Sequence, residues 1–369
     1  MTSVALGRAA VLGIESSCDE TAAAVVRDGR VVLSSVVASQ HEIHEEYAGV
    51  VPELASRAHV ERILPVIRRA LAEAGVGLGM IDAIAVGNRP GLIGSLLVGV
   101  SAAKALAWAL DKPLIGVDHV HAHLYSGALV RADDDRPVEP SSLPTLALPA
   151  LGLVVSGGHT SMYLVRSWTN LARLGSTIDD ALGEAYDKGA KILGLPYPGG
   201  PELDRLARSA NANDRAFDMP ISRLSPESLD FSFSGLKTAL LYAVRGVPGK
   251  NAEHPSIPVP REQFPDLAAS FQRAACKAVI LKLERALARV RSEGNAVSTL
   301  VAGGGVTANS RLRAELAAFA KAHALTLHIP PMEFCVDNAA MIAGLGATLL
   351  ASGESSGLDL KAIPTTSAT

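Results

Sequence analysis

One order of elements occurs twice along the chain. In each half a buried strand is followed by a glycine-rich turn, a helix and a second strand. The predicted ranges are 81–86, 87–91, 92–110 and 113–117 in the first half, and 299–302, 303–309, 310–322 and 325–329 in the second. Strands that form an antiparallel meander precede each series, at 11–14, 21–26 and 31–37, and again at 151–155 and 162–165. The sequence therefore predicts an internal duplication, with two α/β lobes facing one another across a cleft.

The length of 369 residues also favours two lobes, because a single core rarely grows to that size. An Asp run and four prolines mark residues 132–150 as an exposed linker. We therefore expect lobe I over residues 1–131, including the first meander, and lobe II over 151–336. A C-terminal helix over 337–355 is expected to close the cleft, followed by a flexible tail over 356–369.

A pair of histidines suggests a metal site. His119 and His123 would lie on one face if their segment is helical, one turn apart, which suits a single metal ion. An isolated pair of this kind is more often a surface or core feature. The duplication supplies a third ligand, because the interval from Gly303 to Asp337 nearly equals that from Gly87 to His123. Two imidazoles and one carboxylate leave coordination positions open, as in a catalytic site.

Glycine-rich turns follow three of the predicted strands, at 87–91, 156–159 and 303–309. Glycine lets the backbone approach a ligand closely, and helix N-termini favour phosphate. Neither GxGxxG nor GxxxxGK[ST] occurs in these turns, so no single one is specific. Together they favour a nucleotide-binding cleft. Asn309 is expected either to contact ribose or base, or only to cap the following helix.

Other segments have two interpretations. Residues 177–193 are predicted as a charged helix, followed by a rigid Pro-Gly turn over 196–204. Residues 231–237 form either an ordinary strand or a place where Ser234 and Lys237 contact phosphate. The cluster over 41–46 is not HExxH, and a solvated loop or helix face is the preferred interpretation. The helix over 266–291 is predicted to be structural, with Cys276 in the core.

Composition excludes several classes of protein. The net charge of −3 gives no sign of a nucleic-acid partner, so a polynucleotide substrate would need a local basic surface. Three dispersed cysteines argue for a reducing compartment and against a disulfide framework or zinc finger. The N-terminus does not resemble a signal peptide, and the apolar stretch over 143–155 is too short to span a bilayer. We expect a soluble, cytoplasmic protein.

Eight motifs, in order, carry a resemblance to a known family. They are Gly13-Ile14-Glu15-Ser16-Ser17-Cys18-Asp19-Glu20-Thr21, the His119/His123 pair, Val155-Ser156-Gly157-Gly158-His159-Thr160, Asp187-Lys188, Tyr197-Pro198-Gly199-Gly200-Pro201, Phe231-Ser232-Phe233-Ser234-Gly235-Leu236-Lys237, Gly303-Gly304-Gly305-Val306-Thr307-Ala308-Asn309 and Asp337-Asn338-Ala339-Ala340-Met341. From about residue 11 to 355 the chain resembles the TsaD family of tRNA threonylcarbamoyladenosine transferases, formerly called O-sialoglycoprotein endopeptidases. The resemblance implies an actin-like (ASKHA: sugar kinase, Hsp70, actin) fold of two duplicated ribonuclease-H-like lobes around a cleft.

The resemblance also implies an activity and partners. Family members transfer the threonylcarbamoyl group of threonylcarbamoyl-AMP to the exocyclic amine of the adenosine beside the anticodon, in tRNAs that read codons beginning with A, and release AMP. TsaB-like and TsaE-like subunits are the implied protein partners in bacteria, with tRNA as the macromolecular substrate.

Site residues follow from the same resemblance. His119, His123 and Asp337 become the ligands of one divalent metal ion, with Fe2+ preferred over Zn2+. The implied contacts to the adenylate are Val154, Val155, Ser156, Gly157, Gly158, Asp187, Gly200 and Asn309, with Asp204 as a further contact. The chain departs from the family at Asp118, where an Asn is common, and in its longer linker. The first departure is expected to affect the surroundings of the metal ligands.

The mechanistic hypothesis is Lewis-acid polarisation of the carbamoyl carbonyl by the metal, followed by attack of the adenosine amine. Direct transfer is preferred, because no Ser/His/Asp or Cys/His nucleophile pair is evident. Three alternatives remain. A sugar- or acetate-kinase-type phosphotransferase would use the same fold, although Mg2+ prefers oxygen ligands to histidines. A metallopeptidase would need a glutamate in an HExxH relation to the histidines. A non-catalytic, nucleotide-dependent scaffold is the third.

Overall fold

The computed structural model describes residues 9–47, 49–132, 146–246 and 259–365. Its contacts divide the chain into two compact units. Unit 1 consists of Met1–Leu146, Ser167–Asn170 and His328–Thr369, and unit 2 of Ala147–Arg166 and Leu171–Leu327.

Unit 1 is built on a six-stranded sheet with the order β5-β4-β1-β2-β3-β6. Its strands are β1 (Ala10–Glu15), β2 (Glu20–Arg27), β3 (Val31–Ser39), β4 (Ala83–Arg89), β5 (Leu114–Asp118) and β6 (Val130–Arg131). β1, β2 and β3 form the predicted antiparallel meander, and β4 and β5 add to β1 in parallel. The parallel strands β1, β4 and β5 therefore end at the same edge of the sheet.

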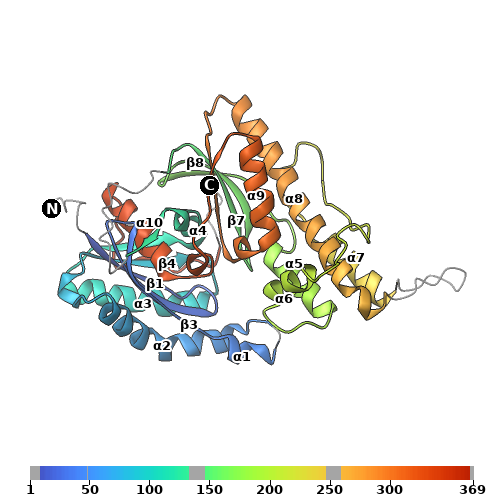
Figure 1. Cartoon of the computed structure of the whole chain (residues 1–369). Coiled ribbons are helices and arrows are strands. Elements are labelled where there is room, and N and C mark those ends of the chain that lie inside the picture. Colours follow the sequence, from blue (N-terminus) through green and yellow to red (C-terminus); the bar gives the residue numbers. More distant parts are fainter. Residues whose placement is uncertain (1–8, 48, 133–145, 247–258, 366–369) are drawn as a thin grey trace, which may run out of the picture. The chain divides into compact units, whose positions relative to one another are not determined.

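Helices cover both faces of this sheet (Figure 1). They are α1 (His41–Glu45), α2 (Pro52–Glu73), α3 (Ile93–Leu110), α4 (His119–Tyr125) and α10 (Ala339–Ala351). Side chains alternate along β1, so Leu12 and Ile14 enter the core beneath α2 and α3, whereas Val11 enters the core beneath α10. Between them, Gly13 lets α10 lie directly on the strand, because a Cβ there would be 2.2 Å from the carbonyl oxygen of Ala339.

α3 has the length and composition of a helix that could cross a membrane, and it is the single such helix found among the described residues. In unit 1 it packs against β4 and α2, and Leu96, Val100 and Ala103 face the core. Ile93 and Leu97 lie on its exposed side. A helix that packs into the core of a protein can have the same length and apolar composition as one that crosses a membrane.

Unit 2 repeats the sheet of unit 1. Its strands are β7 (Ala150–Val155), β8 (Thr160–Ser167), β9 (Asn170–Ser176), β10 (Thr299–Gly303) and β11 (Thr326–His328). Their order, β11-β10-β7-β8-β9, matches β5-β4-β1-β2-β3 position by position, with β7 antiparallel to β8 and parallel to β10. The predicted duplication is therefore confirmed. β9 was not predicted from the sequence.

The helices of unit 2 are α5 (Leu182–Ile192), α6 (Gly199–Ala207), α7 (Ser234–Arg245), α8 (Phe264–Ser292) and α9 (Ser310–Ala322). Short 3-10 turns are η2 (Leu78–Met80), η3 (Ser126–Ala128) and η7 (Met332–Phe334) in unit 1, and η5 (Arg261–Gln263) and η6 (Gly305–Ala308) in unit 2. The helix predicted over 177–193 begins only at Leu182. The preceding residues form a turn in which the hydroxyl of Thr177 donates to the carbonyl of Asp180.

The helix predicted over 337–355 to close the cleft is α10, and it lies in unit 1. It packs on β1, β2 and β4, so Asp337 also belongs to unit 1. Residues 356–365 are not a free tail. The amide of Ser356 donates to the carbonyl of Leu114 at 2.7 Å, and that of Ile363 to the carbonyl of Asn88 at 2.9 Å. Residues 366–369, and 133–145 of the predicted linker, lie outside the described part of the chain.

Candidate functional site

The histidine pair lies on a short helix that begins at the end of β5. Asp118 is its N-cap, and its Oδ1 accepts hydrogen bonds from the amides of Val120 at 2.9 Å and His121 at 3.2 Å. The chain therefore becomes helical at His119, which is the condition for His119 and His123 to lie on one face. The rings of His119 and His123 lie on one face, with centroids 4.6 Å apart.

Asp337 meets both rings from the start of α10. The neighbouring Asn338 caps that helix by accepting from the amide of Met341 at 3.0 Å, which fixes the backbone beside the carboxylate. Oδ1 of Asp337 lies 3.1 Å from Nε2 of His123 and 3.5 Å from Nε2 of His119. The three side chains offer ligand atoms within 4.8 Å of one another, so they form a group that can hold a metal ion. All three belong to unit 1.

Glu15, at the end of β1, fixes the orientation of His119. Its Oε2 lies 3.0 Å from Nδ1 of His119, while its Oε1 accepts the amide of Ser17 at 2.5 Å. A carboxylate can only accept, so Nδ1 carries a hydrogen, and Nε2, on the opposite side of the ring, faces Asp337. This carboxylate–histidine arrangement is typical of metal sites. Sequence reasoning noted the carboxylates of this turn without assigning Glu15 a role.

The electrostatics of the group favour a cation. Burial lowers the pKa of His119, but the nearby Glu15 and Asp337 carboxylates outweigh it and raise that pKa well above its usual value. Burial lowers the pKa of His123. For Asp337 burial acts to raise the pKa, yet the two histidines hold it well below the usual range. The carboxylate is therefore ionised beside a neutral His123.

The donor atoms also fit a metal ion. Both ring nitrogens of His123 are buried and accept or donate no hydrogen bond among the described residues, an uncommon state for buried polar atoms. A cation between Nε2 of His123 and the Asp337 carboxylate would satisfy that nitrogen. Two imidazole nitrogens and one carboxylate oxygen are a ligand set that suits Zn2+ or Fe2+.

The first glycine turn packs against the turn that carries Glu15. A Cβ on Gly87 would lie 2.5 Å from Oε2 of Glu15, and one on Gly91 would lie 2.5 Å from the carbonyl oxygen of Ser17. These glycines therefore make room for the turn that carries Glu15.

Asp118 supports the metal ligands through the helix that carries them. Its carboxylate caps α4 and also lies 3.4 Å from Nε of Arg89.

The second glycine turn, in unit 2, is open. The amide of Ser156 donates to the carbonyl of His159 at 2.8 Å, and Ser156 Oγ accepts the His159 amide at 3.1 Å, which closes the turn. Gly157 and Gly158 are exposed, and a Cβ on either would meet nothing within 4 Å. Their backbone is therefore accessible to a ligand. Val154 and Val155 precede the turn, and their side chains lie in the core.

Asp187 and Gly200 contact one another directly. Oδ1 of Asp187 accepts the amides of Gly199 at 2.9 Å and Gly200 at 3.1 Å, so Asp187 fixes the start of α6. A Cβ on Gly200 would meet nothing within 4 Å. The rigid Pro-Gly turn predicted over 196–204 therefore extends only to Pro198, because helix α6 begins at Gly199, and open space lies above Gly200.

Asp204 and Asn309 are joined through Gln272 of α8, which sequence reasoning missed. Nε2 of Gln272 donates to Oδ1 of Asp204 at 2.9 Å, and its Oε1 accepts from Nδ2 of Asn309 at 3.2 Å. Oδ1 of Asn309 accepts the amide of Leu312 at 3.0 Å, so the predicted helix cap is confirmed. The apolar face of α8 predicts a structural helix, and only the fold brings Gln272 to these residues.

Ser234 and Lys237, the possible phosphate contacts, bind carboxylates instead. Ser234 Oγ donates to Asp179 at 2.7 Å, and Nζ of Lys237 lies 2.9 Å from Oδ2 of Asp180. Both side chains therefore hold the start of α7 to the turn before α5. Phe231 and Phe233, between which Ser232 lies, are buried and stacked.

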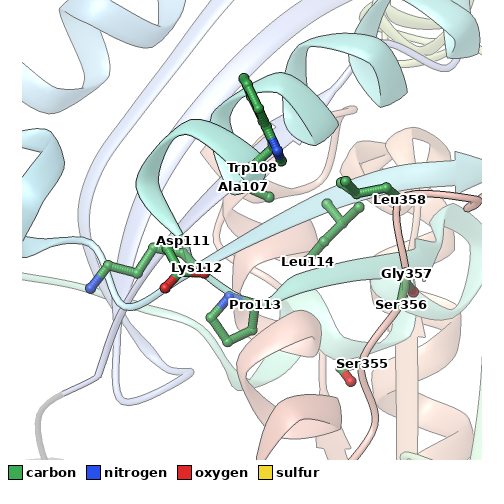
Figure 2. A pocket seen from close by; sticks show the side chains of 10 residues that line it. All are labelled: Ala107, Trp108, Asp111, Lys112, Pro113, Leu114, Ser355, Ser356, Gly357 and Leu358. Atoms are coloured by element: carbon green, nitrogen blue, oxygen red, sulfur yellow. The ribbon is translucent and has the colours of Figure 1, made fainter.

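A separate pocket lies on unit 1, at the start of β5 (Figure 2). Its volume is about 350 Å³, and Trp108 of α3 and Leu358 of the C-terminal segment lie on either side of Leu114. His119 follows the opposite end of the same strand. The pocket contains none of the predicted site residues.

Comparison with known proteins relates the whole chain to one family. Residues 31–344 match the family described as TsaD, tRNA N6-adenosine threonylcarbamoyltransferase. A protein of that name from Anaeromyxobacter dehalogenans is 50% identical over 357 residues, which cover 96% of this chain and 98% of the relative. Another, from Trichlorobacter lovleyi, is 51% identical over 343 residues, 93% of this chain and 92% of the relative.

The chain belongs to the tRNA N6-adenosine threonylcarbamoyltransferase (TsaD) family.

Solved structures agree with the ASKHA fold expected of the TsaD family. HypF from T. kodakarensis aligns with a TM-score of 0.56 at 16% identity, over 94% of this chain and 48% of that chain. Component A of (R)-2-hydroxyglutaryl-CoA dehydratase from Acidaminococcus fermentans aligns with a TM-score of 0.50 at 14% identity, over 93% of this chain and 99% of that chain. At these identities the likeness concerns the fold alone.

Proposed function

We propose that this TsaD-family protein transfers the threonylcarbamoyl group of threonylcarbamoyl-AMP to N6 of the adenosine beside the anticodon in tRNAs that read codons beginning with A. The observation that carries the proposal is the buried His119–His123–Asp337 group, oriented by Glu15, in a chain about half identical to proteins of that name. The amine attacks the carbamoyl carbon, the bond to the phosphate oxygen breaks, and AMP leaves.

His119, His123 and Asp337 are the proposed ligands of one divalent ion, Fe2+ in preference to Zn2+. When bound, such an ion supplies Lewis-acid polarisation of a carbonyl oxygen. The chain's own contribution is orientation. Glu15 keeps the Nδ1 proton on His119, and the two helix caps, Asp118 and Asn338, hold the ligands in place.

Unit 2 is the proposed location of the adenylate. Gly157 and Gly158 present open backbone at the carboxyl end of β7, where α/β sheets commonly bind ligands. Gly200 presents open space at the start of α6, where a ligand can approach the backbone closely. Asp187, which holds the start of α6, and Asp204 and Asn309, which are joined through Gln272, are further proposed contacts. Val154, Val155 and Ser156 support the glycine turn from β7.

Partners and location complete the proposal. tRNA is the proposed acceptor, and TsaB-like and TsaE-like subunits are the proposed protein partners, as the sequence resemblance implies. Cytoplasmic localisation follows from a tRNA substrate and from three cysteines without a disulfide among the described residues.

A reconstituted assay tests the function. Purified protein, synthetic threonylcarbamoyl-AMP, a tRNA reading an A-starting codon and the two partner subunits are incubated, and the tRNA nucleosides are separated by mass. We expect conversion of one adenosine to its threonylcarbamoyl derivative, with AMP as the second product. Unmodified tRNA under these conditions, together with phosphorylation of a small sugar or acid from ATP, would instead establish a phosphotransferase.

A further inference from the structure

We infer that Gln272 is a positioning residue for the nucleotide site, acting through Asn309 and Asp204. The inference rests on the proposed function, because these two residues matter to it as contacts of the adenylate. Gln272 itself is 97% buried, with a relative exposure of 3%. Its effect on a ligand is therefore exerted through its neighbours.

The hydrogen bonds fix the direction of every amide in the chain of contacts. Asp204 can only accept, so the end of Gln272 that faces it at 2.9 Å is the NH2 group. The carbonyl end of Gln272 then faces Asn309, which must donate from Nδ2. This agrees with the other end of Asn309, where Oδ1 accepts the amide of Leu312. Only one arrangement satisfies all three bonds.

The arrangement has a consequence for ligand binding. One Nδ2 hydrogen of Asn309 is given to Gln272, and the NH2 group has a second hydrogen with which to bind an acceptor. Asp204 is likewise fixed, because its Oδ1 also accepts the hydroxyl of Ser310 at 2.7 Å. Gln272 thus holds the amide of Asn309, at the start of α9, and the carboxylate of Asp204, in α6, in one geometry before a ligand binds. This lowers the entropic cost of binding.

A variant without the amide should retain the packing and lose this geometry. Gln272→Met is close in shape and makes no comparable hydrogen bond, so Asn309 keeps only its bond to the Leu312 amide and Asp204 loses one donor. We expect about tenfold weaker binding of AMP, which corresponds to about 1.4 kcal/mol. Cys276→Ala, one turn further along α8, is the matched control. Cys276 is also buried, but it contacts Tyr186 and makes no hydrogen bond to Asp204 or Asn309 among the described residues.

A double-mutant cycle separates positioning from a general loss of structure. Asn309→Ser keeps a residue that caps helices well but removes the amide. If Gln272 acts in part through Asn309, the variant carrying both changes should bind AMP less weakly than the product of the two single losses predicts. A merely structural role predicts that the two losses multiply.

AMP binding is measured by calorimetry on the full chain of wild type and of each variant, with melting temperatures recorded beside it. Tenfold weaker binding by Gln272→Met, normal binding by Cys276→Ala and non-additive losses in the cycle support the inference. The inference is overturned if Gln272→Met binds AMP as tightly as wild type, or if the two losses of affinity in the cycle multiply. Either result leaves the proposed nucleotide site standing. No AMP binding by wild type overturns both. Should Gln272→Met not fold, Gln272→Glu, which cannot donate to Asp204, is expected to weaken AMP binding in its place.

Discussion

Oε2 of Glu15 lies 3.0 Å from Nδ1 of His119, while Nε2 of the same ring approaches Asp337 at 3.5 Å. One carboxylate therefore holds the ring from behind, and the opposite nitrogen meets the second carboxylate. The two partners come from the end of β1 and the start of α10, elements at opposite ends of the sequence. The following predictions depend on this relationship and on the elements that support it.

Replacing Glu15 by Gln should weaken metal binding. The amide has both a donor and an acceptor, so it no longer dictates which nitrogen of His119 carries the proton, and it lacks the charge that increases the ligand's basicity. Loss of such a supporting contact typically costs roughly 10- to 100-fold in metal affinity. Competition with a chromophoric chelator measures the affinity. Glu73→Gln, which alters an exposed ion pair with Arg69, is the control, and equal affinities in the two variants would contradict the prediction.

Replacing Gly87 by Ala should displace the Glu15 carboxylate from its contact with His119. A Cβ at Gly87 would lie 2.5 Å from Oε2 of Glu15, so the carboxylate must move. We expect the free energy of unfolding to fall by about 1–3 kcal/mol, as is usual for overpacking, and metal affinity to fall with it. Gly79→Ala is the control, because a Cβ there meets nothing within 4 Å. Denaturant titration of both variants checks the difference, and indistinguishable curves would show that Glu15 is not held against Gly87.

Removing residues 356–369 should destabilise unit 1. The segment hydrogen-bonds to Leu114 and Asn88 and covers the outer side of β5, which is an edge strand of the sheet. Truncation leaves that edge without the bond from Ser356, so we expect a lower melting temperature and a greater tendency to aggregate. Thermal unfolding and light scattering measure both effects. A truncated chain as stable and monodisperse as the full one would show that the segment contributes nothing.

Acid stability should depend on Asp180. Burial acts to raise the pKa of this carboxyl, but hydrogen bonds from Lys188 and Lys237 outweigh it and lower the pKa. A carboxyl with a lowered folded pKa contributes stability above its unfolded pKa, about 3.9, and loses it as the pH falls through the folded value. Asp180→Asn should therefore be less stable than wild type at neutral pH, with the gap narrowing below about pH 4. Denaturant titrations at several pH values test this, and a gap independent of pH would contradict it.

The sequence was sufficient to predict most strands and helices and the duplication, because buried strands and glycine turns have strong local signals. β9 was missed because Asn170–Ser176 is largely exposed and lacks a clear alternation of apolar residues. The unit to which Asp337 belongs could not be predicted for a different reason. After β11 the chain returns to unit 1, and local pattern does not specify on which of two similar sheets an apolar helix packs.

Supporting residues were harder to predict than the site residues themselves. Glu15 and His119 are separated by 104 positions, and Gln272 and Asp204 by 68, so no spacing connects either pair. Gln272 also lies on a helix whose apolar face predicts a purely structural role. Asp118, by contrast, was noticed as an unusual neighbour of His119, and its role as a helix cap became evident only from the geometry of α4.

The central claim is that a metal ion held by His119, His123 and Asp337 is needed for threonylcarbamoyl transfer. The most direct measurement determines metal content by elemental analysis and tRNA modification by nucleoside mass spectrometry in the same preparations of wild type and Asp337→Ala, each with its partner subunits. We predict about one metal ion per wild-type chain, together with modified tRNA. We predict loss of both in Asp337→Ala while its circular dichroism remains that of a folded protein. Full modification by a folded, metal-free Asp337→Ala variant would contradict the claim.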